Sequence, residues 1–153
     1  MILILRWMKD LGVSMRLLID GNILLDVLKK RMPHYEDSAK VWKMCETGIA
    51  EGYVSALTFA NLIYVMRKEL SPVQIEETLK TLSLIFSFAD LHATDLTAAA
   101  ELKWTDYEDA LQSNAAERIG AEYIVTRNVK DFTDSRVSAV TPSEFLANQF
   151  TTS

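Results

Sequence analysis

The stretch from residue 15 to residue 28 constrains the fold of this chain more than any other. Its apolar run at 17–19 stops at Asp20, and Gly21, Asn22 and an apolar helical pattern follow at once. A short apolar run that turns directly into a helix is typical of a buried strand in an α/β protein. Such proteins build their sites in the crevice beyond the carboxyl ends of their strands. We therefore expect Asp20 to lie at a functional edge of a sheet.

The alternation of strand and helix patterns continues along the whole chain. Further strand patterns lie at 53–55, 84–89, 123–126 and 137–140, and helical patterns lie at 23–31, 35–49, 58–68, 71–82, 94–102, 106–119 and 141–146. The sequence contains no internal repeat and no low-complexity linker. This order predicts an α/β domain of three layers, with a mainly parallel central sheet flanked by helices.

The length of 153 residues indicates one domain, which we place at 15–148. Met15 directly precedes the first strand pattern, so we expect residues 1–14 to be an N-terminal extension and 149–153 to be a tail. The apolar run near residue 1 is short and interrupted by charges, which argues against a signal peptide or a membrane span. The single cysteine, Cys45, excludes an internal disulfide and suits a cytoplasmic protein.

The charge balance restricts the partners of the protein. A net charge of -5 and a pI near 5.0 argue against a protein that coats nucleic acid over its whole surface. His34 and His92 have no cysteine or histidine at the spacing of a zinc site. The glycine-rich phosphate loops and the serine elbow are also missing from the sequence.

Three carboxylates fall at corresponding places in the predicted fold. Asp20 ends the first strand, Asp109 lies in the first turn of a helix, and Asp131 follows the strand at 123–126. Carboxylates that share one crevice repel one another unless a cation neutralises them, and Mg²⁺ or Mn²⁺ suits such oxygen ligands best. Each acid also has an ordinary structural interpretation, as a helix cap, a first-turn charge or a turn former. Asp26 is expected to be a surface charge.

Several motifs resemble the PIN domain, a family of metal-dependent nucleases that includes VapC-type toxins. The similar stretches lie at 18–26, 54–58, 106–112 with 115–116, 125–132 and 140–146. They follow the family's order and span about residues 15–147. The resemblance implies that Asp20 and Asp109 are metal ligands and that Asp131 is a ligand or orients water. Asn22, Thr126, Asn128 and Asp106 would support the ligands.

Asn61 departs from the family pattern, because many members carry a glutamate at this place. An amide oxygen can ligate a metal ion or orient water, so Asn61 remains a candidate catalytic residue. It brings no negative charge, however, and the site must then rely on Asp131 and Asp106.

The resemblance implies a metal-dependent endoribonuclease that uses Mg²⁺ or Mn²⁺ and forms the toxin half of a toxin–antitoxin pair. An RNA substrate, a cognate antitoxin and a homodimer are the expected partners. Arg127 and Lys130, in the turn after the strand at 123–126, are candidates for binding the phosphates.

The sequence leaves two alternatives open. The first is an RNA- or protein-binding module of the same fold, weakened in catalysis by Asn61. The second is a phosphatase-like enzyme with Asp20 as its nucleophile. That class requires a second acid two residues later, where this chain has Asn22.

Overall fold

The computed structural model describes residues 15–151, and within them five strands form one parallel sheet. The strands are β1 (Met15–Ile19), β2 (Ala50–Ser55), β3 (Ser87–Ala89), β4 (Tyr123–Val125) and β5 (Ser138–Val140). Their order across the sheet is β3-β2-β1-β4-β5, and every neighbouring pair is parallel. This arrangement places β1, the strand that leads to Asp20, at the centre of the sheet.

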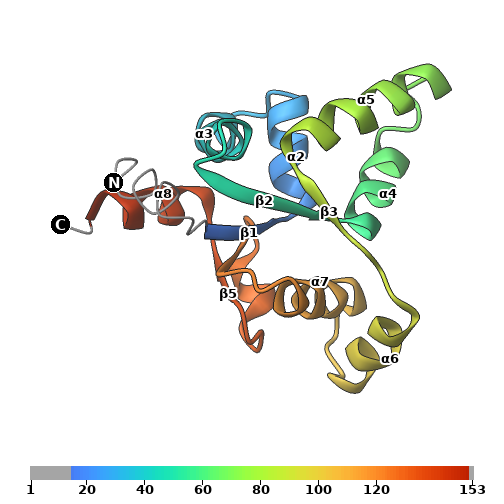
Figure 1. Ribbon diagram of the computed structural model, residues 1–153, viewed down its shortest axis with the longest axis vertical. Coiled ribbons are helices and arrows are strands. Elements are labelled where there is room, and N and C mark those ends of the chain that lie inside the picture. Colours follow the sequence, from blue (N-terminus) through green and yellow to red (C-terminus); the bar gives the residue numbers. More distant parts are fainter. Residues whose placement is uncertain (1–14, 152–153) are drawn as a thin grey trace.

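Helices cover both faces of this sheet, which confirms the predicted three-layer α/β architecture. The helices are α2 (Gly21–Leu28), α3 (Tyr35–Glu46), α4 (Ala56–Val65), α5 (Pro72–Ile85), α6 (Ala93–Glu101), α7 (Tyr107–Arg118) and α8 (Pro142–Thr151), with a 3₁₀ turn, η1, at Val129–Phe132. Helices α2 to α5 lie on one side of the sheet, and α6 and α7 lie on the other (Figure 1). No helix within the described residues is long and apolar enough to cross a membrane.

The alternation of side chains along β1 divides the core into two clusters. Leu17 and Ile19 pack into the larger cluster beneath α2, α3, α4, α5 and α8, whereas Leu18 belongs to a second cluster with Ile124 and Ala116 of α7. Successive residues of a strand point to opposite faces, so one apolar run can serve both. The uninterrupted apolar residues at 17–19 are thus explained by burial on both sides.

Strand register brings the ends of β1 and β4 together. Ile19 pairs with Val125, and the backbone N–H of Asp20 donates to the Val125 carbonyl at 3.0 Å. The residues that follow the two strands, Asp20 and Thr126, therefore lie side by side at the carboxyl edge of the sheet. This is the edge at which the sequence predicted a site.

Helix α5 extends further than its sequence pattern predicts. The strand expected at 84–89 begins only at Ser87, because α5 continues through Ile85. Leu82 is fully buried while Leu84 is 88% exposed, which is the alternation of a helix rather than of a buried strand.

The structure describes the C-terminal limit of the expected domain but not the segment before its N-terminal limit. The proposed extension at 1–14 lies outside the described residues. Helix α8 runs on to Thr151, so part of the expected tail at 149–153 is helical.

Candidate active site

Asp20 is held by hydrogen bonds from three different segments of the chain. Its Oδ1 accepts from the Gly21 N–H at 2.7 Å and from Nε2 of Gln112 at 3.3 Å. Its Oδ2 accepts from the Thr126 hydroxyl at 2.7 Å and lies 3.5 Å from Nδ2 of Asn22. Asp20 itself is the N-cap of α2. Gly21 and Asn22 are therefore the first residues of this helix and do not form a separate turn before it.

These contacts leave Asp20 in a largely desolvated position. Burial raises the pKa of its carboxyl above the ordinary value. Hydrogen bonds from Thr126, Gly21 and Gln112, and the positive charge of Arg127, lower the pKa but do not outweigh burial. The charge of Arg127 compensates the burial of this carboxylate only in part, so the site favours an additional, bound positive charge.

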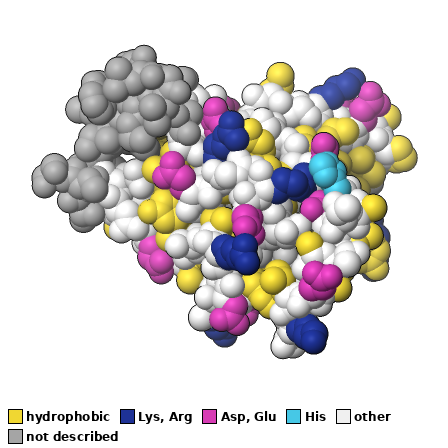
Figure 2. Space-filling view, turned by 60° about the horizontal axis from the view of Figure 1, so that its bottom comes forward, with side chains coloured by type: hydrophobic (Ala, Val, Ile, Leu, Met, Phe, Trp, Pro, Cys, Tyr) yellow, Lys and Arg dark blue, Asp and Glu magenta, His cyan; other side chains and the backbone are white. Residues whose placement is uncertain are grey.

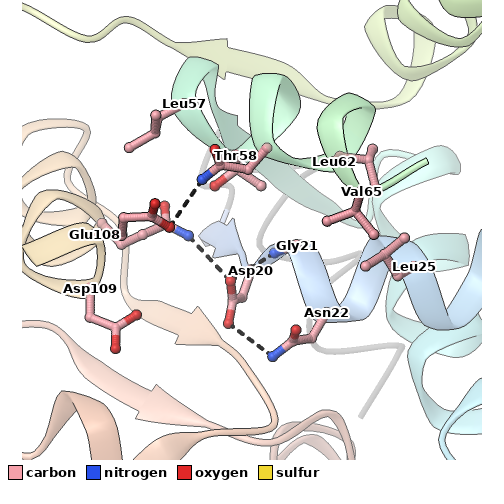
Figure 3. A pocket seen from close by; sticks show the side chains of 12 residues that line it. Asp20, Gly21, Asn22, Leu25, Leu57, Thr58, Leu62, Val65, Glu108 and Asp109 are labelled. Atoms are coloured by element: carbon pink, nitrogen blue, oxygen red, sulfur yellow. Dashed lines mark hydrogen bonds between the residues drawn. The ribbon is translucent and has the colours of Figure 1, made fainter. Parts of the chain in front are cut away.

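A pocket of about 180 Å³ opens in front of Asp20, between α2, α4 and α7. Figure 3 shows the carboxylates of Asp20 and Asp109 on facing sides of this pocket. Asn22, Asn61 and Glu108 also line it, together with Gly21, Leu25, Leu57, Thr58, Leu62, Val65 and Gln112. The pocket therefore combines apolar side chains, most of them from α4, with oxygen-bearing side chains from α2 and its N-cap, α4 and α7.

Neighbouring acids raise the pKa of Asp109. Burial raises its pKa most, and the charges of Asp106, Asp20, Asp131 and Glu108 raise it further, to about 7. Four acids thus act on one carboxylate, although they come from three separate parts of the chain. A divalent cation placed among them would relieve this repulsion.

Asp131 is not among the residues that line the pocket of Asp20. It lines a second hollow with Asp106, Asp109 and Lys130. Asp109 lines both hollows. Asp106 accepts a hydrogen bond from the Asp109 N–H at 3.1 Å and caps α7, in agreement with its structural interpretation.

The remaining predicted residues fall into two groups. Thr126 is fully buried, and its hydroxyl accepts from the backbone N–H of Asn128 at 3.0 Å while donating to Asp20. Asn61, in contrast, is not among the hydrogen-bond donors to Asp20, and its Nδ2 donates to Oε2 of Glu108 at 3.1 Å. Asn128 thus supports Asp20 indirectly through Thr126, and Asn61 acts on a different acid.

The interpretation of Asp26 as a surface charge is wrong. Asp26 is fully buried, with Arg31 and Arg127 at 3.1 Å from its two carboxylate oxygens and the Ser38 hydroxyl donating at 3.1 Å. Its position three residues after the buried Ile23 places it on the inner face of α2. Arg127, a predicted phosphate-binding residue, is therefore anchored on Asp26.

Sequence reasoning also missed Gln112 and Glu108. Gln112 is 6% exposed and donates to Asp20, while its Oε1 accepts no hydrogen bond from any described residue. Both residues could have been found from their helical spacing to Asp109, because residues 108, 109 and 112 share one face of α7.

The chemistry of these residues fits a hydrated Mg²⁺ or Mn²⁺ ion. Within residues 15–151 no three Asp, Glu, His or Cys side chains converge tightly enough to enclose a metal ion. Mg²⁺, however, commonly keeps several waters and takes only one or two carboxylates from the protein. Asp20 and Asp109 could supply these carboxylates, and the unsatisfied Oε1 of Gln112 could accept a hydrogen bond from a metal-bound water.

Residues 16–130 match the family model of the PIN domain, which covers most of the chain. This protein belongs to the PIN domain family. The match includes the Asp20 and Asp109 segments and both faces of the pocket. It agrees with the resemblance found in the sequence motifs and with the parallel order of the sheet.

Solved structures with the same fold include proteins of toxin–antitoxin systems. VapBC2 from Rickettsia felis, bound to a DNA fragment from its promoter, is 18% identical, with a TM-score of 0.64 over 83% of the present chain and 98% of the VapBC2 chain. A toxin–antitoxin complex from Klebsiella pneumoniae is 23% identical, with a TM-score of 0.63 over 82% and 96%. At these identities the similarity establishes the fold.

A third structure extends the same similarity. Mycobacterium tuberculosis VapC20, described as a sarcin-ricin loop cleaving toxin, is 12% identical, with a TM-score of 0.65 over 82% of the present chain and 99% of the VapC20 chain. No curated protein matches the sequence significantly.

Proposed function

We propose that this PIN domain is a metal-dependent endoribonuclease whose active site is the pocket between Asp20 and Asp109. The observation that carries the proposal is that both carboxylates face one pocket at the carboxyl edge of the sheet, with raised pKa values that a cation would lower. A bound Mg²⁺ or Mn²⁺ ion would activate water and neutralise charge on the scissile phosphate. We propose RNA rather than DNA as the substrate because of the family resemblance. The description of VapC20 as a sarcin-ricin loop cleaving toxin supports this choice.

The protein's own residues would prepare the site in two ways. Thr126, Gly21 and Gln112 fix the orientation of the Asp20 carboxylate with hydrogen bonds, which reduces the reorganisation needed when the ion binds. Asp109 must lose its proton before it can act as a ligand, and its pKa of about 7 places this step near neutral pH. Asp131 acts on Asp109 from the second hollow and would tune the charge there rather than bind at the same point.

Phosphate binding would depend on a few cations rather than on a basic surface. Figure 2 shows Lys and Arg scattered among Asp and Glu on one face of the molecule, with no large patch of a single sign. Arg127 is the best-placed cation, because its charge already acts on the Asp20 carboxyl. Lys130 lines the hollow next to Asp109.

We also propose that a cognate antitoxin binds and neutralises this protein. The support is that VapBC2 and the Klebsiella pneumoniae structure are toxin–antitoxin complexes with this fold. The expected homodimer can be tested by light scattering of the purified protein.

A binding module without catalysis is the second candidate function, and Asn61 is the observation that favours it. Incubation of labelled RNA with the protein and Mg²⁺ or Mn²⁺, with and without EDTA, separates the two functions. Metal-dependent cleavage supports the nuclease. Retention of intact RNA in a gel-shift assay, with no cleavage under any metal condition, supports the binding module.

A further inference from the structure

Glu108 lies at the rim of the Asp20 pocket and is held there from a different helix. It comes from the first turn of α7 and lines the pocket (Figure 3). Its Oε2 accepts a hydrogen bond from Nδ2 of Asn61, on α4, at 3.1 Å. A glutamate in a first turn could simply favour the helix dipole. That role needs no partner on another helix, so the contact with Asn61 indicates a second role for Glu108.

The neutral amide of Asn61 suits this arrangement better than an acid would. An amide N–H can donate to a carboxylate, whereas a glutamate at position 61 would repel Glu108. The pocket therefore lacks a charge on α4 but gains one on α7, facing the same space. Glu108 already acts electrostatically on Asp109, its neighbour in the sequence and in the pocket.

A second observation at the same place points to a ligand. The Oε1 of Gln112 is buried and unsatisfied, although the Nε2 of the same amide donates to Asp20. An unpaired buried acceptor is costly, so it calls for a donor such as an ordered water. Gln112 lies four residues after Glu108, one helical turn deeper in the pocket.

We propose that Glu108, positioned by Asn61, supplies the third carboxylate of the pocket and, with Gln112, holds the water shell of the bound divalent cation. This inference rests on the proposed function, and it assigns to Glu108 the negative charge that Asn61 does not provide. Glu108 acts through metal-bound water rather than as a direct ligand, which agrees with the open geometry of the acids. Asn61 is accordingly a positioning residue.

The test measures Mn²⁺ binding to the full-length metal-free protein by isothermal titration calorimetry, without RNA. Glu108→Gln is expected to weaken Mn²⁺ binding on the order of tenfold, the usual lower range for losing a supporting group. Glu117→Gln is the matched control, because Glu117 lies on the same helix in an exposed ion pair with Arg136. It makes the same change in net charge and should leave Mn²⁺ affinity nearly unchanged.

Two further variants separate positioning from a general structural effect. Asn61→Ala should weaken Mn²⁺ binding in the wild-type background but have little effect when combined with Glu108→Gln, because its role depends on Glu108. Asn61→Glu combined with Glu108→Gln returns the carboxylate to α4 and should restore most of the lost affinity. Thermal unfolding of each metal-free variant reports whether the fold is retained.

The outcomes distinguish this inference from the proposed function. Equal Mn²⁺ affinity of wild type and Glu108→Gln, or an equal loss in Glu117→Gln, overturns the role of Glu108. Mn²⁺ binding that depends on Glu108, without RNA cleavage by the wild type, supports the role and overturns the nuclease proposal. If the wild type binds no Mn²⁺, both are overturned.

Discussion

The hydroxyl of Thr126 donates to Oδ2 of Asp20 at 2.7 Å, although 106 positions separate the two residues in the sequence. The contact exists because β1 and β4 are neighbouring parallel strands in register, so the residues after each strand meet at one edge. The same hydroxyl accepts from the Asn128 N–H. Thr126 therefore links the turn after β4 to the carboxylate that faces the pocket.

Thr126→Val tests this link. Valine preserves the shape of the side chain but removes the hydrogen bond that orients Asp20, so we expect metal affinity and RNA cleavage to fall on the order of tenfold. Mn²⁺ titration and single-turnover cleavage measure the two effects. Thr78→Val, on the exposed face of α5, makes the same chemical change and should alter neither. A Thr126→Val protein with full metal affinity would contradict the link.

The raised pKa of Asp109 predicts pH-dependent metal binding. The ion requires the ionised carboxylate, and the pKa of this group is about 7 in the metal-free protein. Below that pH, Mn²⁺ must compete with a proton, and affinity should fall by up to about tenfold per pH unit. Calorimetric titration from about pH 6 to pH 8 measures the slope. A constant affinity over this range would show that Asp109 is not a ligand.

The same shift predicts how Asp109 affects stability. The folded state binds the Asp109 proton more tightly than the unfolded state, whose pKa is near 3.8, so the unfolding free energy falls as pH rises from about 4 to about 7. Asp109→Asn should therefore stabilise the metal-free protein at pH 8, by roughly 1–2 kcal/mol after allowance for solvent screening. Urea unfolding at pH 4 and pH 8 tests this, and the gain should vanish at pH 4.

Asp26→Ala should be strongly destabilising. It would leave the guanidinium groups of Arg31 and Arg127 without the carboxylate that both contact at 3.1 Å. Breaking a buried ion pair in this way costs about 3–5 kcal/mol. Asp90→Asn, at a side chain that is 83% exposed, is the control and should change the unfolding free energy little. A cost below about 1 kcal/mol for Asp26→Ala would contradict the anchoring role of Asp26.

Gly52→Ala tests the packing of β2 against α3. A Cβ at position 52 would lie 2.6 Å from Sγ of Cys45 and 2.7 Å from Cδ1 of Phe86, both buried. Overpacking of this kind costs about 1–3 kcal/mol. Addition of Cys45→Ala removes one of the two clashes and should recover part of the loss. Equal stability of Gly52→Ala and wild type in urea would show that the sheet relaxes freely there.

Much of the fold could be predicted from the sequence because its determinants are local. Apolar runs at 17–19 and 123–125, each followed by a polar residue and a turn, marked the two strands that build the site edge. Asp106, as a candidate N-cap, also placed Asp109 in the first turn of its helix. The strand at 84–89 was predicted too long, since an apolar run gives no sign of where a helix ends and a strand begins.

The missed residues depend on contacts between distant segments. Asp26 was expected at the surface because its helical position was placed off the apolar face, and its partner Arg127 comes from the far end of the domain. The pairing of Asn61 with Glu108 joins α4 to α7, and no local sequence pattern predicts this contact. Gln112 could have been found by extending the helical face of Asp109 by one turn.

RNA cleavage by the wild type and Asp20→Asn, each with Mn²⁺ and with EDTA, tests the central claim most directly. Asp90→Asn serves as the control for loss of a carboxylate outside the pocket. We predict cleavage by the wild type and Asp90→Asn in Mn²⁺, no cleavage with EDTA, and a loss of at least about a hundredfold in Asp20→Asn. Cleavage by Asp20→Asn at the wild-type rate, or cleavage that persists in EDTA, would contradict the assignment of this pocket as a metal-dependent nuclease site.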